Sequence, residues 1–153
     1  MKKLTKLIVC VLLLAFVLPN VAQATAVKEQ TQQIICFEDG SYITVEISEI
    51  ETRANSTKSG KKTYVYNSSS GDEQWRAVLS GTFTYTGTTA TCTASSGSVT
   101  IANDAWYTVS KTSSKSGASA ILDLTMGRKF LGITVEKKAI NMKLTCDKNG
   151  NLS

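Results

Sequence analysis

The chain has 153 residues, with 17 lysines and arginines against 12 acidic residues, four cysteines, one proline and no histidine. This length allows one domain of ordinary size. Without histidine, the sequence excludes histidine-dependent catalytic triads and histidine-ligated metal sites. We expect neither a cofactor nor a metal ion.

Residues 1–24 have the three parts of a secretory signal peptide. Three lysines precede an uninterrupted apolar run from Leu7 to Val17, and small residues end the segment at Ala24. The apolar run is too short for a permanent membrane anchor. We therefore predict cleavage after Ala24 and a secreted, extracellular protein that does not stay in the membrane. Losing three of 17 cations leaves 14 against 12 acidic residues, which is too even a balance to favour nucleic acid.

Residues 25–33 are polar and without periodicity, so we expect a flexible N-terminal arm there. The rest, 34–153, is dominated by apolar and polar side chains that alternate with a period of two. A helix cannot sort residues in this way, because its period is 3.6. The alternation is cleanest from Trp75 to Thr86, and because this run is long for one strand, Gly81 is expected to mark a bulge or bend.

Turn signals separate the alternating runs at a spacing that fits seven to nine strands. Each run has one apolar face and one polar face, which is typical of antiparallel sheets with one side in water. We therefore predict an all-β fold for residues 34–153, a single antiparallel β-sandwich. The side chains expected in its core are Trp75, Leu79, Phe83, Leu122, Leu124 and Leu144.

Three cysteines remain after cleavage, and their spacing with a tryptophan is similar to that of immunoglobulin domains. Trp106 lies between Cys92 and Cys146, as a tryptophan does between the two cysteines of an inter-sheet disulfide. Both cysteines lie on the apolar side of their runs, so we predict a disulfide between them and a buried thiol at Cys36. Leu144 stands where a tyrosine corner would place tyrosine, so we expect an immunoglobulin-like architecture without the immunoglobulin topology.

Several short segments resemble a group of small secreted proteins of Gram-positive gut bacteria. They are Gly81–Gly87, Thr91–Ser95, Trp106, Lys115–Ala120 and Leu144–Ser153, within roughly residues 75–153. No activity is attached to that group, so the resemblance implies an extracellular β-rich fold and no catalytic residue.

Tyr64 and Tyr66 form the candidate ligand-binding pair. In a strand, their rings share one face about 6.6 Å apart, from which both could stack on a sugar chain. The alternative has both rings in the core with Val65 outward, and we favour it because buried aromatics are commoner than platforms.

Catalytic and metal-binding signals are weak. Asp104, Asp123 and Glu136 are candidates for a pair of carboxylates that cleaves glycosides, but nothing in their spacing brings two of them together. Asp147 opens like a calcium-binding loop, yet the chain ends before the glutamate that such a loop needs at its twelfth position. We expect neither a catalytic residue nor a calcium site.

The predicted function is that of a secreted binding or interaction module, not an enzyme, with an extracellular glycan, a cell-wall polymer or a surface protein as its partner. A small glycoside hydrolase is the first alternative, and a compact pair of carboxylates in a cleft would favour it. A secreted toxin or membrane-active factor is the second. It is disfavoured because neither an amphipathic helix nor an exposed apolar hairpin is evident in the sequence.

Overall fold

The structure, a computed structural model, describes residues 27–50 and 56–153. The predicted signal peptide and its cleavage site at Ala24 lie outside these residues. Within them, no helix is long and apolar enough to cross a bilayer. The described residues form eight strands: β1 (Val27–Cys36), β2 (Tyr42–Ile50), β3 (Thr57–Asn67), β4 (Glu73–Tyr85), β5 (Ala90–Ile101), β6 (Trp106–Ser116), β7 (Ser119–Phe130) and β8 (Ile133–Thr145).

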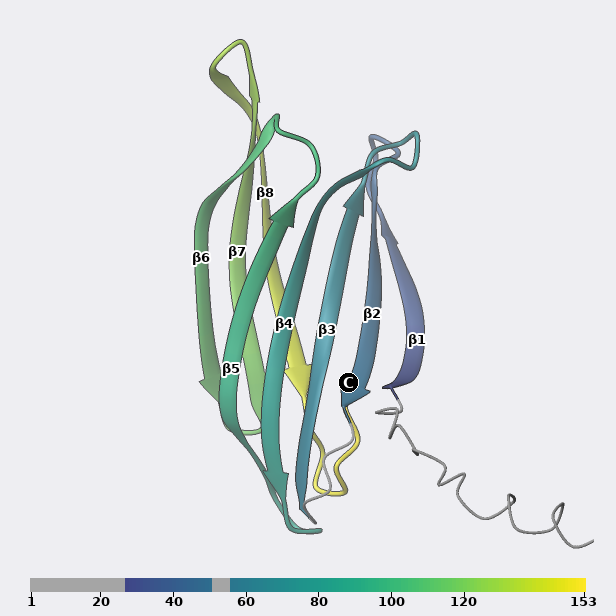
Figure 1. Ribbon diagram of the computed structural model, residues 1–153, viewed down its shortest axis with the longest axis vertical. Helices are drawn as coiled ribbons and strands as arrows, with labels where there is room; N and C mark the ends of the chain where they lie inside the picture. The colour runs from purple at the N-terminus through teal and green to yellow at the C-terminus, as the bar shows by residue number, and fades with distance from the viewer. Residues whose placement is uncertain (1–26, 51–55) are drawn as a thin grey trace, which may run out of the picture.

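The strands form two antiparallel sheets, with the orders β1-β2-β3-β4-β5 and β6-β7-β8 (Figure 1). The predicted all-β sandwich is confirmed. Within each sheet, every strand pairs with the next one along the chain, so the described strands form meanders. Immunoglobulin domains use Greek-key connections instead, so the likeness to them is one of architecture only.

Because the strands run alternately up and down, the connections gather at the two ends of the sandwich. We call one of these the loop end, where four connections lie: residues 37–41, 68–72, 102–105 and 131–132. Figure 1 shows the hairpin between β7 and β8 extending beyond the other connections at this end. The loop end thus brings together segments that lie far apart along the chain.

The core lies between the sheets and contains every side chain predicted for it. Trp75, Leu79, Phe83, Leu122, Leu124 and Leu144 are all buried. Burying each such side chain stabilises the fold by about 1.5–3 kcal/mol, which is why the alternation fixes the inward face of each strand.

The irregularity predicted at Gly81 is not at the glycine, which pairs regularly with Gly60 and Ser95. The pairing of β4 with β5 shifts between Thr82 and Phe83. The Phe83 ring then lies over Gly81, where a Cβ atom would come within 2.6 Å of it. Glycine is therefore required there by close packing.

The predicted flexible arm needs correction, because the sheet extends into it. Residues 27–36 form β1, which pairs with β2 at the edge of the five-stranded sheet. An edge strand is held by backbone hydrogen bonds on one side, so it needs no apolar periodicity to form. This is why the polar composition of the segment was misleading.

The cysteine predictions are partly wrong. Cys92 and Cys146 are buried as expected, but all three described cysteines are free thiols, so the predicted disulfide is not formed. Their backbone amides donate to the carbonyls of Gly117 and Ala118, at the end of the sandwich opposite Trp106. The immunoglobulin-like arrangement of tryptophan against disulfide is therefore absent. Cys36, predicted to be buried, is exposed because it lies on the edge strand β1.

Candidate functional site

A cavity of about 160 Å³ opens at the loop end, where the two sheets meet. We call it the loop-end pocket. Strands β3, β4 and β6 contribute Tyr66, Gln74 and Trp106, while the end of β7 and the start of β8 contribute Arg128 and Glu136. The connections before β2 and β4 add Asp39 and three serines. The pocket is thus built by both sheets and by segments far apart in the sequence.

The aromatic side of the pocket belongs to a packed cluster. The Tyr66 ring stacks on Trp75 with centroids 5.1 Å apart, and Trp106 meets Tyr66 edge-on at 5.3 Å. Phe37 contacts the same tyrosine edge-on at 6.0 Å. Such arrangements are the favourable ones for aromatic pairs, so the cluster holds this wall rigidly.

The proposed platform of Tyr64 and Tyr66 is wrong. Only 3% of Tyr66 is exposed, and Tyr64 is half-buried against the core. Both rings are on the inward face of β3, as the alternative interpretation had it. They are used for packing because an aromatic ring gains more from burial between two sheets than from exposure. Tyr66 reaches the loop-end pocket only at the pocket wall.

Trp106 brings an unpartnered hydrogen-bond donor to the pocket. Only 4% of this residue is exposed, and its indole Nε1–H has no acceptor within the described residues. A buried donor without an acceptor costs about 1–3 kcal/mol. The Nε1–H of Trp75 also lacks an acceptor, but Trp75 is completely buried and does not line the pocket. Of these two tryptophans, Trp106 is therefore the one that carries its unpartnered donor at the pocket wall.

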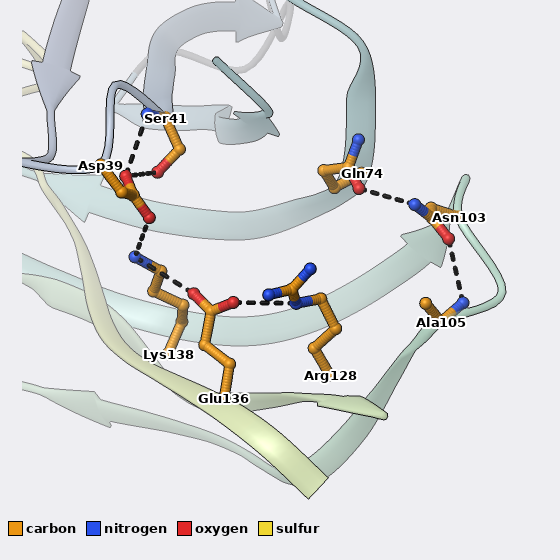
Figure 2. A network of polar contacts seen from close by, with 8 residues as sticks. All are labelled: Asp39, Ser41, Gln74, Asn103, Ala105, Arg128, Glu136 and Lys138. Atoms are coloured by element: carbon orange, nitrogen blue, oxygen red, sulfur yellow. Dashed lines mark hydrogen bonds and ion pairs between the residues drawn. The ribbon is translucent and has the colours of Figure 1, made fainter. Parts of the chain in front are cut away.

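The charged side of the pocket belongs to a chain of four alternating charges, of which Asp39, Glu136 and Arg128 line the cavity and Lys138 lies beside them (Figure 2). Lys138 Nζ lies 3.7 Å from Asp39 Oδ2 and 3.4 Å from Glu136 Oε1. Arg128 Nε in turn lies 2.9 Å from Glu136 Oε2. The Ser41 hydroxyl and amide both donate to Asp39, and with Lys138 nearby they hold the pKa of this carboxyl below its ordinary value.

The opposite rim is fixed by amide hydrogen bonds (Figure 2). Asn103 Nδ2 donates to Gln74 Oε1 over 2.7 Å, and the Ala105 amide donates to Asn103 Oδ1 over 3.0 Å. Gln74 Nε2 donates to the Asp72 carbonyl over 2.9 Å. The side-chain orientations on this rim are therefore set before any ligand arrives.

The carboxylates singled out in the sequence do not come together. Asp123 accepts a hydrogen bond from Asn141 Nδ2 at 2.6 Å on the outer face of the three-stranded sheet, and Asp104 lies in the connection before β6. Of these three candidates, Glu136 is the one that lines the pocket. The second carboxylate in the pocket wall is Asp39. Sequence reasoning missed Asp39, because it stands in an ordinary turn far from Glu136 along the chain.

These two carboxylates are poorly placed for acid–base chemistry. Glycoside cleavage needs one carboxyl that stays protonated near neutral pH, which requires a raised pKa. The pKa of Asp39 moves the other way, and Glu136 accepts ion pairs from two cations. The arrangement supplies fixed donors and acceptors, and the two carboxylates cancel the two cations.

A second hollow lies on the outer face of the three-stranded sheet. It measures about 320 Å³ and is lined mainly by small polar side chains, including Ser110, Thr112 and Asp123. Asp123 is already satisfied by Asn141, and no unpartnered buried donor lines this hollow within the described residues. The loop-end pocket is therefore the stronger candidate.

Comparisons with protein-family models, curated proteins and solved structures give no match for this chain. The resemblance noted in the sequence stays an expectation. The functional conclusion therefore depends on the loop-end pocket itself.

Proposed function

We propose that this protein is a secreted binding module whose loop-end pocket takes one small, neutral, polar group, such as a single sugar unit of an extracellular polysaccharide. The observation that carries the proposal is that Trp106 lines a polar cavity while its buried Nε1–H has no acceptor in the described residues. A sugar hydroxyl is an acceptor of the right kind for this donor.

The size of the pocket favours a single unit. Pockets that enclose drug-sized ligands measure about 300–1,000 Å³, whereas this one measures about 160 Å³. One sugar ring, or the end of a chain, fits this scale better than a longer segment.

The charges favour a neutral ligand over an acidic one. Asp39 and Glu136 balance Arg128 and Lys138, so no net charge is left to attract an ion. Carboxylate oxygens accept hydrogen bonds while guanidinium and amide groups donate them, and sugar hydroxyls can do both. Alternating donors and acceptors around a pocket suit such a ligand.

Binding is favoured over hydrolysis by the ion pairs that hold both carboxylates. A general acid would need a proton that Asp39, with its lowered pKa, gives up well below neutral pH. The observation that favours the alternative of a glycoside hydrolase is that two carboxylates, Asp39 and Glu136, line the same pocket.

The experiment compares two tryptophan variants of the secreted form on an array of neutral and acidic glycans, followed by calorimetry with the neutral glycan bound best. Trp106→Phe keeps most of the ring and removes the donor. We expect it to weaken binding by about fivefold to tenfold, the equivalent of one hydrogen bond. Trp75→Phe is the matched control, because it removes an unpartnered donor outside the pocket.

Trp75→Phe should bind like the parent protein. Equal losses in the two variants would mean that core packing and not the donor matters. If no neutral glycan is retained, or if Trp106→Phe binds as tightly as the parent, the proposal is refuted.

A further inference from the structure

The tip of the hairpin between β7 and β8 exposes four large apolar side chains. Phe130 is 67% exposed, Leu131 87%, Ile133 70% and Val135 53%. The sequence had suggested that no apolar hairpin is exposed, and the structure corrects this. The alternation in this stretch predicts a strand, but the hairpin extends beyond the sandwich, where no second sheet covers it.

The first residue of the turn at this tip, Leu131, does not suit the backbone conformation of the turn. Phe130 pairs with Ile133, so Leu131 and Gly132 form a two-residue turn, with φ of 49° and 81°. Turns with positive φ at both positions favour asparagine, aspartate or glycine at the first. Leucine is strained there because of its Cβ, and it also gains nothing from burial. Among the described residues, the remaining positive φ angles belong to glycines, apart from that of Ser56.

A strained and exposed leucine does not serve the stability of the fold. Strain of this kind is a reason to look for a function at the residue that bears it. Asparagine in the same place would make a better turn and a more soluble surface, so the apolar tip is a feature that needs another explanation.

Positive charge lies behind the apolar tip. Residues 128–138 contain four cations and one carboxylate, Glu136, which is paired with Arg128 and Lys138. Lys129 and Lys137 are exposed. Lys129 pairs with Thr134 in the ladder, and the next pair, Phe130 and Ile133, lies on the opposite face. The hairpin tip, residues 129–137, is thus an apolar point with lysines behind it.

We propose that the hairpin tip docks the protein on an anionic lipid bilayer. Phenylalanine, leucine and isoleucine enter the boundary between headgroups and acyl chains, and the lysines contact anionic headgroups. A bilayer accepts a narrow point of this kind. A stable protein partner needs a broad complementary patch of about 800 Å² on each side, and the tip is a projection and not a patch. Docking on a bilayer goes beyond the proposed function and does not depend on it.

The test is co-flotation of the secreted form with vesicles of two compositions: equal parts of phosphatidylglycerol and phosphatidylcholine, and phosphatidylcholine alone. We expect binding to the anionic vesicles that weakens with added salt, because exposed charges are screened. Leu131→Asn should reduce this binding by about tenfold or more, which is a readily measured change in affinity. The same variant should fold at least as stably as the parent, because Asn-Gly suits the turn.

Two further variants complete the test. Ile34→Asn is the matched control, since Ile34 is 63% exposed on β1, the edge strand of the other sheet, and should leave binding unchanged. Leu131→Trp should give indole fluorescence that shifts to shorter wavelength when anionic vesicles are added.

Three results would overturn the proposal. The first is no binding to the anionic vesicles. The second is equal binding by Leu131→Asn and the parent. The third is self-association of the parent that Leu131→Asn abolishes while neither protein binds vesicles, which would make the tip a contact between two copies of this chain.

Discussion

Single residues decide the chemistry of this molecule, and two donors of the same kind illustrate how. The Nε1–H groups of Trp75 and Trp106 are both buried without an acceptor in the described residues, and of the two residues Trp106 lines the loop-end pocket. The unsatisfied donor of Trp75 lies in the core and lowers the stability of the fold by about 1–3 kcal/mol. The unsatisfied donor of Trp106 belongs to a residue of the pocket wall, and under the proposed function a ligand accepts its hydrogen bond.

The thiols offer a residue-scale prediction. In the native protein, an alkylating reagent should modify exposed Cys36 rapidly, while Cys92 and Cys146 should be protected. Burial raises the pKa of both protected thiols and so lowers their thiolate fraction, which is the reactive form. Mass spectrometry after timed exposure to iodoacetamide measures the rates.

After unfolding without a reductant, all three described cysteines should react. If Cys92 and Cys146 stay unmodified until a reductant is added, they form a disulfide in the native protein, and the assignment of free thiols is contradicted.

Sequence reasoning succeeded for residues whose position follows from parity. A period of two fixes the face of every residue in a strand once one is known, which is why Trp75 and Leu122 were predicted to be buried. Parity does not say which segments meet at the end of a sandwich. Asp39 and Glu136 are brought together by loop packing, so their pairing around Lys138 could not be predicted.

At the scale of elements, the last residues of the chain close the end of the sandwich opposite the loop end. Leu152 is 5% exposed, lies in an isolated bridge with Cys146 and packs over Gly60 of β3. The Asp147 carboxylate accepts hydrogen bonds from the backbone amides of Asn149 and Asn151, each over 2.8 Å. These bonds fix the turn that precedes Leu152. The segment that resembled a calcium loop therefore covers one end of the hydrophobic core.

Leu152→Ala should accordingly lower the free energy of unfolding by about 2–4 kcal/mol, because it opens a cavity between the sheets. Urea denaturation followed by tryptophan fluorescence measures this. Leu131→Ala is the control, and at an exposed position it should change stability by less than about 0.5 kcal/mol. A loss no larger in Leu152→Ala than in the control would show that the C-terminal segment does not contribute to the core.

Element edges are also where sequence reasoning failed. β1 was missed because an edge strand can be polar, and the β7–β8 hairpin was misjudged because alternation signals a strand without saying what covers it. Both errors concern strands with an uncovered side. Hydrophobic periodicity reports burial, so it is least informative for such strands.

The whole molecule should be insensitive to pH across the neutral range. The chain has no histidine, so no side chain with an ordinary pKa titrates between about pH 5 and about pH 8. The lowered pKa values of Asp39 and Asp147 mean that their contribution to stability is present above about pH 4 and lost as pH falls further.

The two buried cysteines lower the stability of the fold as pH rises, and not as it falls. The pKa values of Cys92 and Cys146 are raised, so their contribution is complete below the ordinary thiol pKa of about 8.5 and is lost as pH rises above it. Urea midpoints measured at intervals should form a plateau between these two limits. A step near pH 6.5 would show that some group other than these carboxyls and thiols changes its protonation on folding.

The central claim is that a ligand enters the loop-end pocket and accepts a hydrogen bond from the indole Nε1–H of Trp106. The chain has two tryptophans, so a ¹⁵N–¹H NMR spectrum contains two indole signals, which the two phenylalanine variants assign. On titration with the neutral glycan bound best on the array, the Trp106 indole signal should move while the Trp75 signal stays in place. If the glycan saturates the protein and the Trp106 signal does not move, or only the Trp75 signal moves, the claim is contradicted.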